Sequence, residues 1–452
     1  MMSAKYKKKG ALVPRLRFSE FIGDREWDCA QMGDIYAFKK NNSFSRDMLN
    51  YNAGDVKNIH YGDIHKKFSS HFYAENENIP FVNCNINLGN ISEDCLCTAG
   101  DIIFADASED IKDIGKCIEI ISNNKERILS GLHTIFTRQF SSTLVIGFGG
   151  YLFQSPRVRA QIQKEAQGTK ILGISSGRLA KISISFPFAK GEQQKIADCL
   201  SSLDERIAAE TNKLDALKAH KKGLLKQLFP AEGETLPQLR FPEFQDAGEW
   251  EEVPLSKLVS SLDAGVSVNA GDRPATSEEM GILKTSAVTN GVFEPQENKV
   301  VLDVVEIGRM RESVRRNTII ISRMNTPALV GANAYVDTNF ENIFLPDRLW
   351  AAKPKPDTSM RFISFILSSN QGRATLALSA KGSSGSMKNI TKSDVLAFLA
   401  MIPSLPEQQR IADCLSSLDE LITAQTQKID LLKEHKKGLM QQLFPRIDEV
   451  RA

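Results

Sequence analysis

Two stretches of the chain carry a heptad pattern of hydrophobic positions, and this pattern predicts two long α-helices. They cover residues 192–230 and 407–445, where hydrophobic residues alternate at spacings of four and three. No proline interrupts either stretch, and each ends at Leu-Phe-Pro. A helix of about 36 residues is roughly 50 Å long. The seam positions are Ile196, Leu200, Leu203, Ile207, Leu214, Leu217, Leu224 and Leu228 in the first stretch, and Ile411, Leu415, Leu418, Ile422, Ile429, Leu432, Leu439 and Leu443 in the second.

The two predicted helices can bury their seams against each other. We expect an antiparallel coiled-coil pair, because that packing leaves room for one globular domain at each end. Polar residues interrupt the seams at Glu210 and Lys221 in the first helix and at Gln425 and Lys436 in the second. Glu210 and Gln425 are candidates for residues that set the register of the pair. A helical hairpin with no spacing role is the alternative.

The helical stretches belong to an internal repeat. They align without a gap at an offset of 215, with ten differences over 39 positions. Residues 14–21 match residues 237–244 at an offset of 223, and a weaker match relates residues 174–187 to 390–403. The inserts between these anchors, about 30–165 and 255–380, do not align. A repeated frame with unlike inserts favours two copies of one task with two specificities, and duplication followed by drift is the alternative.

The inserts contain strand-like runs between turn signals, which predicts mixed α/β (α+β) domains. We expect a pseudo-twofold arrangement of two such domains separated by the helix pair. The predicted boundaries are 1–27 for an N-terminal tail and opening segment, 28–190 for the first domain, 191–230 for the first helix, 231–405 for the second domain, and 406–452 for the second helix and a C-terminal tail.

Composition describes a globular chain of 452 residues, 42% hydrophobic and 25% charged. No stretch is long and apolar enough to span a membrane, and no signal-peptide core follows the basic N-terminus. Seven cysteines, an odd number, indicate reduced thiols, so we expect a cytoplasmic protein. The net charge is only +2, so any basic binding surface must be local.

Polar and basic residues gather in a few predicted loops of the inserts. In the first insert they surround a Gly-Asp turn at 62–63, and in the second an Asn-Gly turn at 290–291 and a loop that follows a buried strand. Such side chains contact base edges and phosphates, although an ordinary solvated loop is the alternative for each residue. The candidates are Asn58, His60, Tyr61, His65, Lys66, Lys67, Lys170, Lys284, Thr285, Asn290, Arg323, Asn325, Thr326, Lys381, Ser384 and Lys388. The His-Lys-Lys runs at 220–222 and 435–437 could also contact phosphates, but a solvated helix face is favoured.

Catalytic and metal-binding motifs are not recognisable in the chain. Residues 382–388 lack the spacing of a phosphate loop, and the glycine-rich residues 147–150 are interpreted as a tight turn. Cys95 and Cys97 have no second pair to complete a zinc site. We therefore expect no catalytic residue and no metal site.

The frame resembles the specificity subunit of type I restriction–modification enzymes. The resemblance covers nearly the whole chain and is carried by the openings at 14–21 and 237–244, the Glu-Gln-Gln-x-Ile-Ala starts at 192–197 and 407–412, and the Lys-Lys-Gly-Leu ends at 221–230 and 436–445. Within the inserts, residues 60–65, 100–103, 323–326, 329–331 and 347–349 look like motifs of that family's target-recognition domains.

The resemblance implies a non-catalytic subunit that reads a bipartite, asymmetric site on double-stranded DNA. Each insert would read one half, and the helix pair would fix the gap; its length of roughly 50 Å is close to one and a half turns of B-DNA, at about 34–36 Å per turn. Two modification subunits would supply the S-adenosylmethionine chemistry, and restriction subunits would use ATP and Mg²⁺, so this chain would bind no cofactor itself. The alternatives are the recognition part of a fused restriction–methylation enzyme, and a coiled-coil scaffold with no DNA role.

Overall fold

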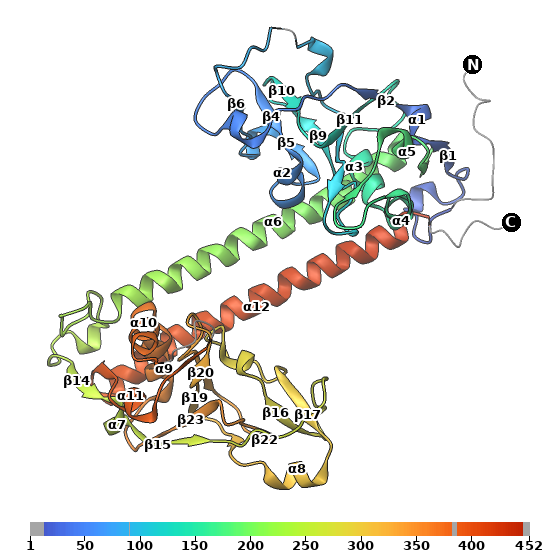
Figure 1. The fold of residues 1–452 in the computed structure, drawn as a ribbon. Helices are drawn as coiled ribbons and strands as arrows, with labels where there is room; N and C mark the ends of the chain where they lie inside the picture. The colour runs from blue at the N-terminus through green and yellow to red at the C-terminus, as the bar shows by residue number, and fades with distance from the viewer. Residues whose placement is uncertain (1–12, 90, 382–386, 446–452) are drawn as a thin grey trace. The chain divides into compact units, whose positions relative to one another are not determined.

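The computed structural model describes residues 13–89, 91–381 and 387–445. Contacts divide the chain into two compact units. Unit 1 combines residues 1–212 with 426–452, and unit 2 consists of residues 213–425. Both long helices cross this division, so each unit contains one part of α6 (Lys190–Gln227) and one part of α12 (Leu405–Leu443) (Figure 1). None of the described helices is long and apolar enough to cross a membrane.

Unit 1 contains short strands and short helices besides its parts of α6 and α12. The strands are β1 (Asp28–Gln31), β2 (Tyr36–Lys39), β3 (Leu49–Asn50), β4 (Lys57–Ile59), β5 (His71–Tyr73), β6 (Phe81–Val82), β7 (Ile102–Ala105), β8 (Ala107–Ser108), β9 (Cys117–Ser122), β10 (Ile128–Ser130), β11 (Thr134–Gln139), β12 (Leu172–Gly173) and β13 (Ser183–Phe186). The helices are α1 (Met32–Ile35), α2 (Tyr61–Lys66), α3 (Phe148–Gln154), α4 (Pro156–Glu165) and α5 (Ser176–Leu179).

Unit 2 is built from a similar set of elements. The strands are β14 (Glu251–Pro254), β15 (Val259–Ala264), β16 (Met280–Leu283), β17 (Asn298–Val301), β18 (Ser313–Val314), β19 (Thr318–Ser322), β20 (Met324–Asn325), β21 (Asn333–Val336), β22 (Phe340–Phe344), β23 (Leu349–Pro354), β24 (Lys388–Asn389) and β25 (Leu399–Ile402). The helices are α7 (Leu255–Leu258), α8 (Val304–Arg309), α9 (Met360–Ser368), α10 (Asn370–Leu378) and α11 (Lys392–Leu396).

One sheet is common to both units. Its strand order is β2-β11-β7-β9 in unit 1, where β5 extends it, and β15-β23-β19-β21 in unit 2. Neighbours within both four-strand sets are antiparallel. The inserts therefore share a fold although their sequences do not align, because buried strands require hydrophobic residues of suitable shape rather than particular ones.

The second sheet differs between the units. In unit 1 its order is β10-β4-β6-β3, with β10 and β4 parallel. In unit 2 its order is β17-β16-β22-β18, with β16 parallel to β22 and antiparallel to β17. The prediction of two α/β domains on a repeated frame is confirmed. The two inserts differ in strand order in the second sheet, whereas the strand order of the shared sheet is the same.

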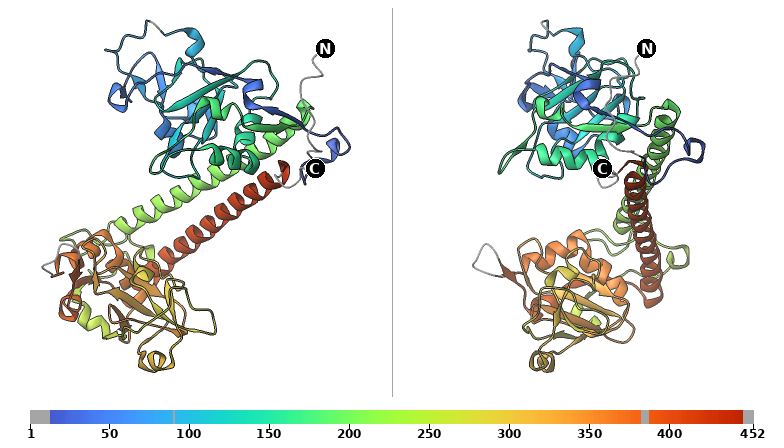
Figure 2. Two further views of the ribbon diagram at one scale, coloured as in Figure 1. Left: turned by 45° about the vertical axis from the view of Figure 1, so that its right-hand side comes forward. Right: turned by 90° about the vertical axis from the view of Figure 1, so that its right-hand side faces the viewer.

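Both ends of each long helix pack into domain cores. Ile196 and Leu200 of α6 and Leu443 of α12 belong to the hydrophobic core of unit 1, together with residues of α3 and α4. Figure 2 shows the start of α6 and the end of α12 beside the strands and short helices of that unit. The expectation that the whole seam packs helix against helix is therefore wrong at these ends. The fully buried seam residues are Ile196, Leu200, Leu214, Leu228, Ile411, Leu415, Ile429 and Leu443, and the other predicted seam residues are half-buried.

Ion pairs between the helices show their direction within unit 1. Asp204 of α6 pairs with Lys436 of α12 at 2.6 Å, and Glu210 pairs with Lys428 at 2.5 Å. Because a later residue of α6 meets an earlier residue of α12, the two segments are antiparallel. Unit 2 has the equivalent pair, Lys221 with Asp419 at 2.5 Å. Lys221 and Lys436 thus lie in ion pairs between the helices, at the seam positions that the heptad pattern gave them. The favoured interpretation of the His-Lys-Lys runs as a solvated helix face does not hold for these two lysines.

The repeated opening segments attach to the repeated helix starts. In unit 1 the Arg17 guanidinium donates to both carboxylate oxygens of the buried Glu192, at 2.8 and 2.7 Å, and Trp27 Nε1 donates to the same carboxylate at 3.2 Å. We call this the Arg–Glu–Trp cluster. The cluster of unit 2 consists of Arg240, Glu407 and Trp250, with distances of 2.7, 2.7 and 3.4 Å.

The opening segments also bond to the ends of the long helices. Leu16 N–H donates to the carbonyl of Gln442 at 3.0 Å, and Leu239 N–H donates to the carbonyl of Gln227 at 2.9 Å. The first bond joins the two ends of the chain within unit 1, and the second is local in sequence. The same hydrogen bond between an opening segment and a helix end thus joins residues far apart in the sequence in unit 1 and residues close in the sequence in unit 2.

Candidate nucleic-acid interface

A closed loop at residues 167–173 carries the predicted candidate Lys170. The main chains of Gln167 and Gly173 exchange two hydrogen bonds, of 2.9 and 2.7 Å, which close the loop. Strand β12 at its end pairs with β8, which follows the shared-sheet strand β7. Lys170 is exposed, so the loop presents a positive charge to solvent.

Unit 2 has an equivalent loop closure, formed by Lys381 and Asn389, while residues 382–386 between them lie outside the described residues. Lys381 and Asn389 exchange main-chain hydrogen bonds of 2.8 and 2.9 Å, and β24 pairs with β20, which follows β19. Lys381 is exposed and Lys388 is half-buried, while Ser384 lies outside the described residues. The two loops have unlike sequences, but each carries lysine.

The bases of the two closed loops have the same main-chain hydrogen bonds. In unit 1, Asp106 N–H donates to the carbonyl of His133 at 3.1 Å, and the Asp106 carbonyl accepts from the amide that follows the loop at 2.9 Å. In unit 2, Arg323 N–H donates to the carbonyl of Arg348 at 3.0 Å, and the Arg323 carbonyl accepts from the amide after the loop at 2.9 Å. These two residue pairs therefore occupy equivalent positions.

The side chains at these equivalent positions are chemically unlike. Asp106 Oδ1 lies 3.3 Å from His133 Nδ1; burial raises the pKa of Asp106, and the neighbouring imidazole opposes that rise. Arg323 places its guanidinium 5.8 Å from the ring centre of Trp350, and its Nε is buried without a hydrogen-bond partner among the described residues. Arg348 is exposed. The foot of the loop in unit 1 carries a carboxylate beside an imidazole, and the foot of the loop in unit 2 carries two guanidinium groups.

Helix α2 brings three of the predicted residues next to the base of the loop in unit 1. The ring of Tyr61 lies 5.2 Å from that of His133, 6.2 Å from that of His65 and 4.7 Å from that of His60. His65 Nε2 is 2.9 Å from the carbonyl oxygen of Ala107 in β8. We expected a turn at residues 62–63, but these residues lie in α2. His60 Nδ1 accepts a hydrogen bond from the Gly62 amide and caps the start of this helix.

Lys66 and Lys67 differ in their electrostatic surroundings. Lys67 is paired at 3.2 Å with the buried Asp63, which also accepts from Arg46 at 2.8 and 3.1 Å. Lys66 is exposed at the end of α2. Burial, followed by the Arg46 charge, lowers the pKa of His60. Lys66 is therefore the cation of this pair with more capacity to attract a phosphate.

Asn58 does not lie on the surface. Its side chain is fully buried in β4, and neither polar atom has a hydrogen-bond partner among the described residues. It packs against Gly131, where an added Cβ would approach the Asn58 amide to 2.4 Å. The expectation that Asn58 belongs to an exposed loop is wrong, because the strand pairing of β4 with β10 was not visible in the sequence.

The remaining candidates of unit 2 are largely engaged with their neighbours. Lys284 pairs with Glu297 at 3.4 Å, and Asn290 donates to Glu294 at 2.9 Å. Thr285 is half-buried and begins a short 3-10 helix, Thr285–Val288. Near the closed loop, Asn325 is half-buried and accepts from the amide of Thr326 at 2.9 Å, whereas Thr326 is exposed.

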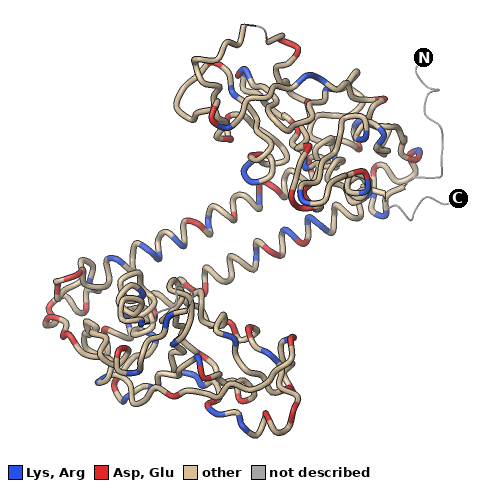
Figure 3. The backbone as a smooth tube through the Cα atoms, viewed as in Figure 1, with Lys and Arg blue, Asp and Glu red and all other residues tan. Residues whose placement is uncertain are grey.

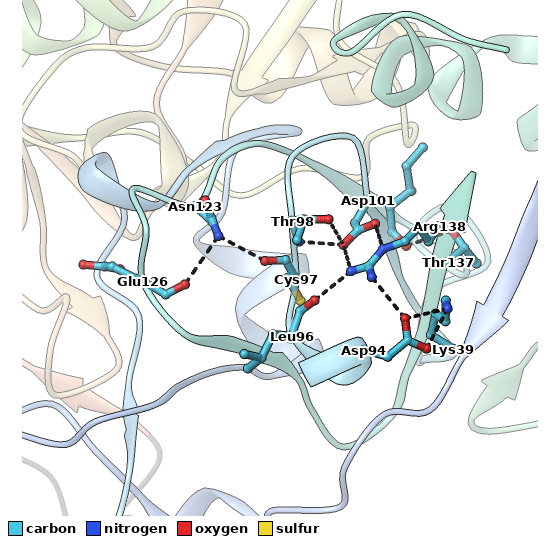
Figure 4. A network of polar contacts seen from close by, with 11 residues as sticks. Lys39, Asp94, Leu96, Cys97, Thr98, Asp101, Asn123, Glu126, Thr137 and Arg138 are labelled. Atoms are coloured by element: carbon cyan, nitrogen blue, oxygen red, sulfur yellow. Dashed lines mark hydrogen bonds and ion pairs between the residues drawn. The ribbon is translucent and has the colours of Figure 1, made fainter. Parts of the chain in front are cut away.

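Asp101, in the motif at residues 100–103, has a structural role. Its buried carboxylate accepts from Arg138 at 2.8 and 2.7 Å, and from the amide of Thr98 at 2.6 Å (Figure 4). Arg138 also donates to the carbonyl of Leu96 at 2.7 Å. The network anchors the segment before β7 to β11 and so supports the strand that leads to Asp106 and to β8, the partner of β12.

Charged residues of both signs occur throughout the part of the chain that the structure describes. Acidic and basic residues are interspersed along the helices and within both units (Figure 3). Sequence reasoning named Arg323 but passed over Asp106 and His133, and it noted Arg348 only as part of a motif. No local signal distinguishes these residues, because what places them is the pairing of β7 with β11 and of β19 with β23. Among the described residues, no group of three potential ligands is arranged to hold a metal ion.

Comparison with known proteins gives a consistent result. The model of the type I restriction modification DNA specificity domain matches residues 24–219 and, again, residues 249–434. The type I restriction enzyme HindI specificity subunit of Haemophilus influenzae is 23% identical over 205 residues, which are 45% of this chain and 42% of that protein. The putative MjaX specificity subunit of Methanocaldococcus jannaschii is 24% identical over 361 residues, 76% of this chain and 77% of that protein.

Solved structures show the same fold. The S subunit of a type I restriction–modification system from M. genitalium matches with a TM-score of 0.61 at 14% identity, covering 96% of this chain and 100% of that one. A chain from a structure describing complex assembly and conformational transition of the type I R-M system matches with a TM-score of 0.51 at 15% identity, covering 93% and 97%. At these identities the likeness concerns the fold alone.

Proposed function

This chain belongs to the type I restriction–modification DNA specificity family, and we propose that it reads a two-part DNA site, one half through each unit. The observation that carries the proposal is the pair of equivalent closed loops, each basic and each built on the shared sheet, with unlike side chains at their bases. A repeated scaffold holds the two readers in equivalent ways, while different side chains give the halves different sequences. The site would then be asymmetric.

The chemistry of modification and cleavage would lie on partner subunits. The role of a specificity subunit is non-catalytic. We propose that two modification subunits bind the repeated frame and bring S-adenosylmethionine to a flipped adenine in each half, and that restriction subunits bring ATP and Mg²⁺. The complex would act on double-stranded DNA in the cytoplasm.

The gap between the half-sites would be set by the helix pair. A four-residue insertion in α6 lengthens that helix by about 6 Å, or one to two base pairs at roughly 3.4 Å each. We expect the complex with such an insertion to methylate sites with a longer gap and unchanged halves, as read by mapping methylated adenines across a genome. The same four residues inserted between Glu232 and Gly233, in an exposed linker, should leave the gap unchanged.

Two results would contradict this function. If the wild-type complex methylated DNA without sequence preference, the reading role would be wrong. If the α6 insertion left the gap unchanged while the halves were still recognised, the spacing role alone would be wrong. A fused enzyme would be indicated by methylation from the purified chain alone.

A further inference from the structure

We infer that the residues at the bases of the two closed loops are specificity-determining. Asp106 with His133 would contact one nucleobase in one half-site, and Arg323 with Arg348 would contact one nucleobase in the other half-site. The inference rests on the proposed function and names the chemistry of each half. No sequence motif marks Asp106 or His133. Neither the sequence motifs nor the similar proteins indicate which nucleobase any of the four residues contacts.

The geometry singles out these positions in two ways. First, the main-chain hydrogen bonds are the same in both units, so the side chains leave equivalent points of the shared sheet. Second, both positions contain a buried polar atom without a hydrogen-bond partner among the described residues, Asp106 Oδ1 and Arg323 Nε. Asp106 Oδ1 lies 3.3 Å from His133 Nδ1, a contact that uses at most one of the acceptor sites of this oxygen. Buried polar atoms normally have partners, so unused capacity at both points indicates a ligand.

The surroundings fit DNA in both units. Tyr61 supplies an aromatic face 5.2 Å from the His133 ring, and Lys170 lies in the exposed loop above the base. In unit 2, Lys381 is exposed beside the loop base, and Arg348 has a side chain free of ion pairs within the described residues. Lysine side chains can bind phosphates, and phosphate contacts position a protein on DNA. Asp106, His133, Arg323 and Arg348 would then contact the edges of the nucleobases.

The chemistry of the side chains predicts which bases they read. A guanidinium donates two hydrogen bonds to O6 and N7 of guanine, so Arg348, held next to Arg323, would read a G·C pair. A carboxylate accepts from an exocyclic amino group, so Asp106 would read the amino group of cytosine or adenine. The half-site of unit 2 should therefore require guanine as the contacted base, whereas the half-site of unit 1 should present cytosine or adenine to Asp106 at the equivalent place.

The test uses the complex of this chain with its modification subunits and maps methylated adenines. Arg348→Gln should relax one G·C pair in one half-site, with discrimination there falling about tenfold to a hundredfold and the other half unchanged. Arg348→Lys should retain part of the preference, because lysine also donates to guanine O6 and N7. Asp106→Asn should relax one position in the opposite half. Arg316→Gln and Asp55→Asn are matched controls at exposed residues away from the loops, and should change neither half.

The outcomes separate the inference from the function on which it rests. Relaxation confined to one base pair of one half supports the inference. Full retention of both halves by Arg348→Gln and Asp106→Asn overturns it, as does equal weakening of both halves. Thermal melting of each variant complex identifies loss of folding, and in that case the Arg348→Lys variant decides, because it keeps the charge. Loss of sequence preference in the wild type would instead refute the proposed function.

Discussion

Unit 1 and unit 2 have the same frame but different joints between frame and recognition domain. In unit 1, Lys436 pairs with Asp204, which also accepts from the Tyr151 hydroxyl at 2.8 Å, and the ring of His71 lies 4.3 Å from that of Tyr151. In unit 2 the equivalent pair is Lys221 with Asp419, and Phe365 holds the ring position below the lysine. Arg361 supplies the additional polar contacts there, donating to Ser416 at 2.9 Å and lying 3.5 Å from Asp419. The lysine–aspartate pair is repeated, and its third partner is not.

The two units differ least where a buried charge needs a specific partner and most where only hydrophobic packing is required. The Arg–Glu–Trp clusters and the helix pairs are nearly identical because a buried charge needs its particular partner. The shared sheets differ in sequence because hydrophobic packing accepts many side chains. The third partner at each joint depends on the domain that contacts it, so it follows the divergence of the inserts.

The largest effect is expected at the Arg–Glu–Trp clusters. Arg17→Met leaves the buried Glu192 carboxylate without its cation and should lower the free energy of unfolding of unit 1 by about 3–5 kcal/mol. Arg240→Met should do the same in unit 2. Urea unfolding followed by tryptophan fluorescence measures both. Clearly unequal losses would show that the clusters are not equivalent.

A smaller and unequal effect is expected at the aromatic ends of the helices. Phe444 is fully buried against Trp27 and Phe148, whereas its counterpart Phe229 is half-buried. Phe444→Ala should cost about 3–4 kcal/mol and Phe229→Ala about 1–2 kcal/mol less, because the cost follows the apolar area lost. Thermal unfolding of the two variants compares them, and a greater loss at Phe229 would contradict the packing.

A pH effect near neutrality is expected in unit 1 at Glu119. The buried Glu119 carboxylate accepts from the amides of Gly147 and Gly150 at 2.9 and 2.6 Å, and burial raises its pKa from 4.5 to about 7. The folded state therefore holds this proton more tightly than the unfolded chain, so stability is greatest below pH 4.5 and falls as pH rises toward 7. The full change is on the order of 3 kcal/mol.

His71 acts in the opposite sense, because burial lowers its pKa below 6.5 and stability from this group falls as pH drops. Between pH 6.5 and 7.5 the Glu119 effect should therefore dominate. Hydrogen exchange at residues 146–152, corrected for intrinsic rates, should become faster across this interval. A Glu119→Gln variant cannot ionise at this position and should lose the pH dependence, and a persisting slope would refute the assignment.

The smallest effect is expected at the joint itself. Tyr151→Phe removes the hydrogen bond to Asp204 but keeps the ring, so it should cost about 1 kcal/mol in unit 1. The change makes unit 1 resemble unit 2, where Phe365 lies below Lys221. Chemical unfolding is the measurement, and a loss above about 3 kcal/mol would show that the hydroxyl does more than bond Asp204.

The sequence by itself determined the repeat, the two long helices and the α/β character of the inserts, because heptad spacing and near-identical segments are local signals. It also placed Lys170, Lys381 and Arg323 in or beside the loops that the structure shows to be equivalent. It misplaced Asn58, and it interpreted residues 147–150 as a turn, although Glu119 caps a helix that begins there.

Tertiary structure alone decided the shared sheet, the packing of the helix ends into domain cores, and the pairing of Asp106 with His133 and of Arg323 with Arg348. These features depend on which strands become neighbours, and partners separated by about 25 residues leave no periodic trace in the chain. Helical seams repeat within a few residues and can be read directly. Strand pairing is a long-range choice among many compatible registers, so only the folded chain reveals it.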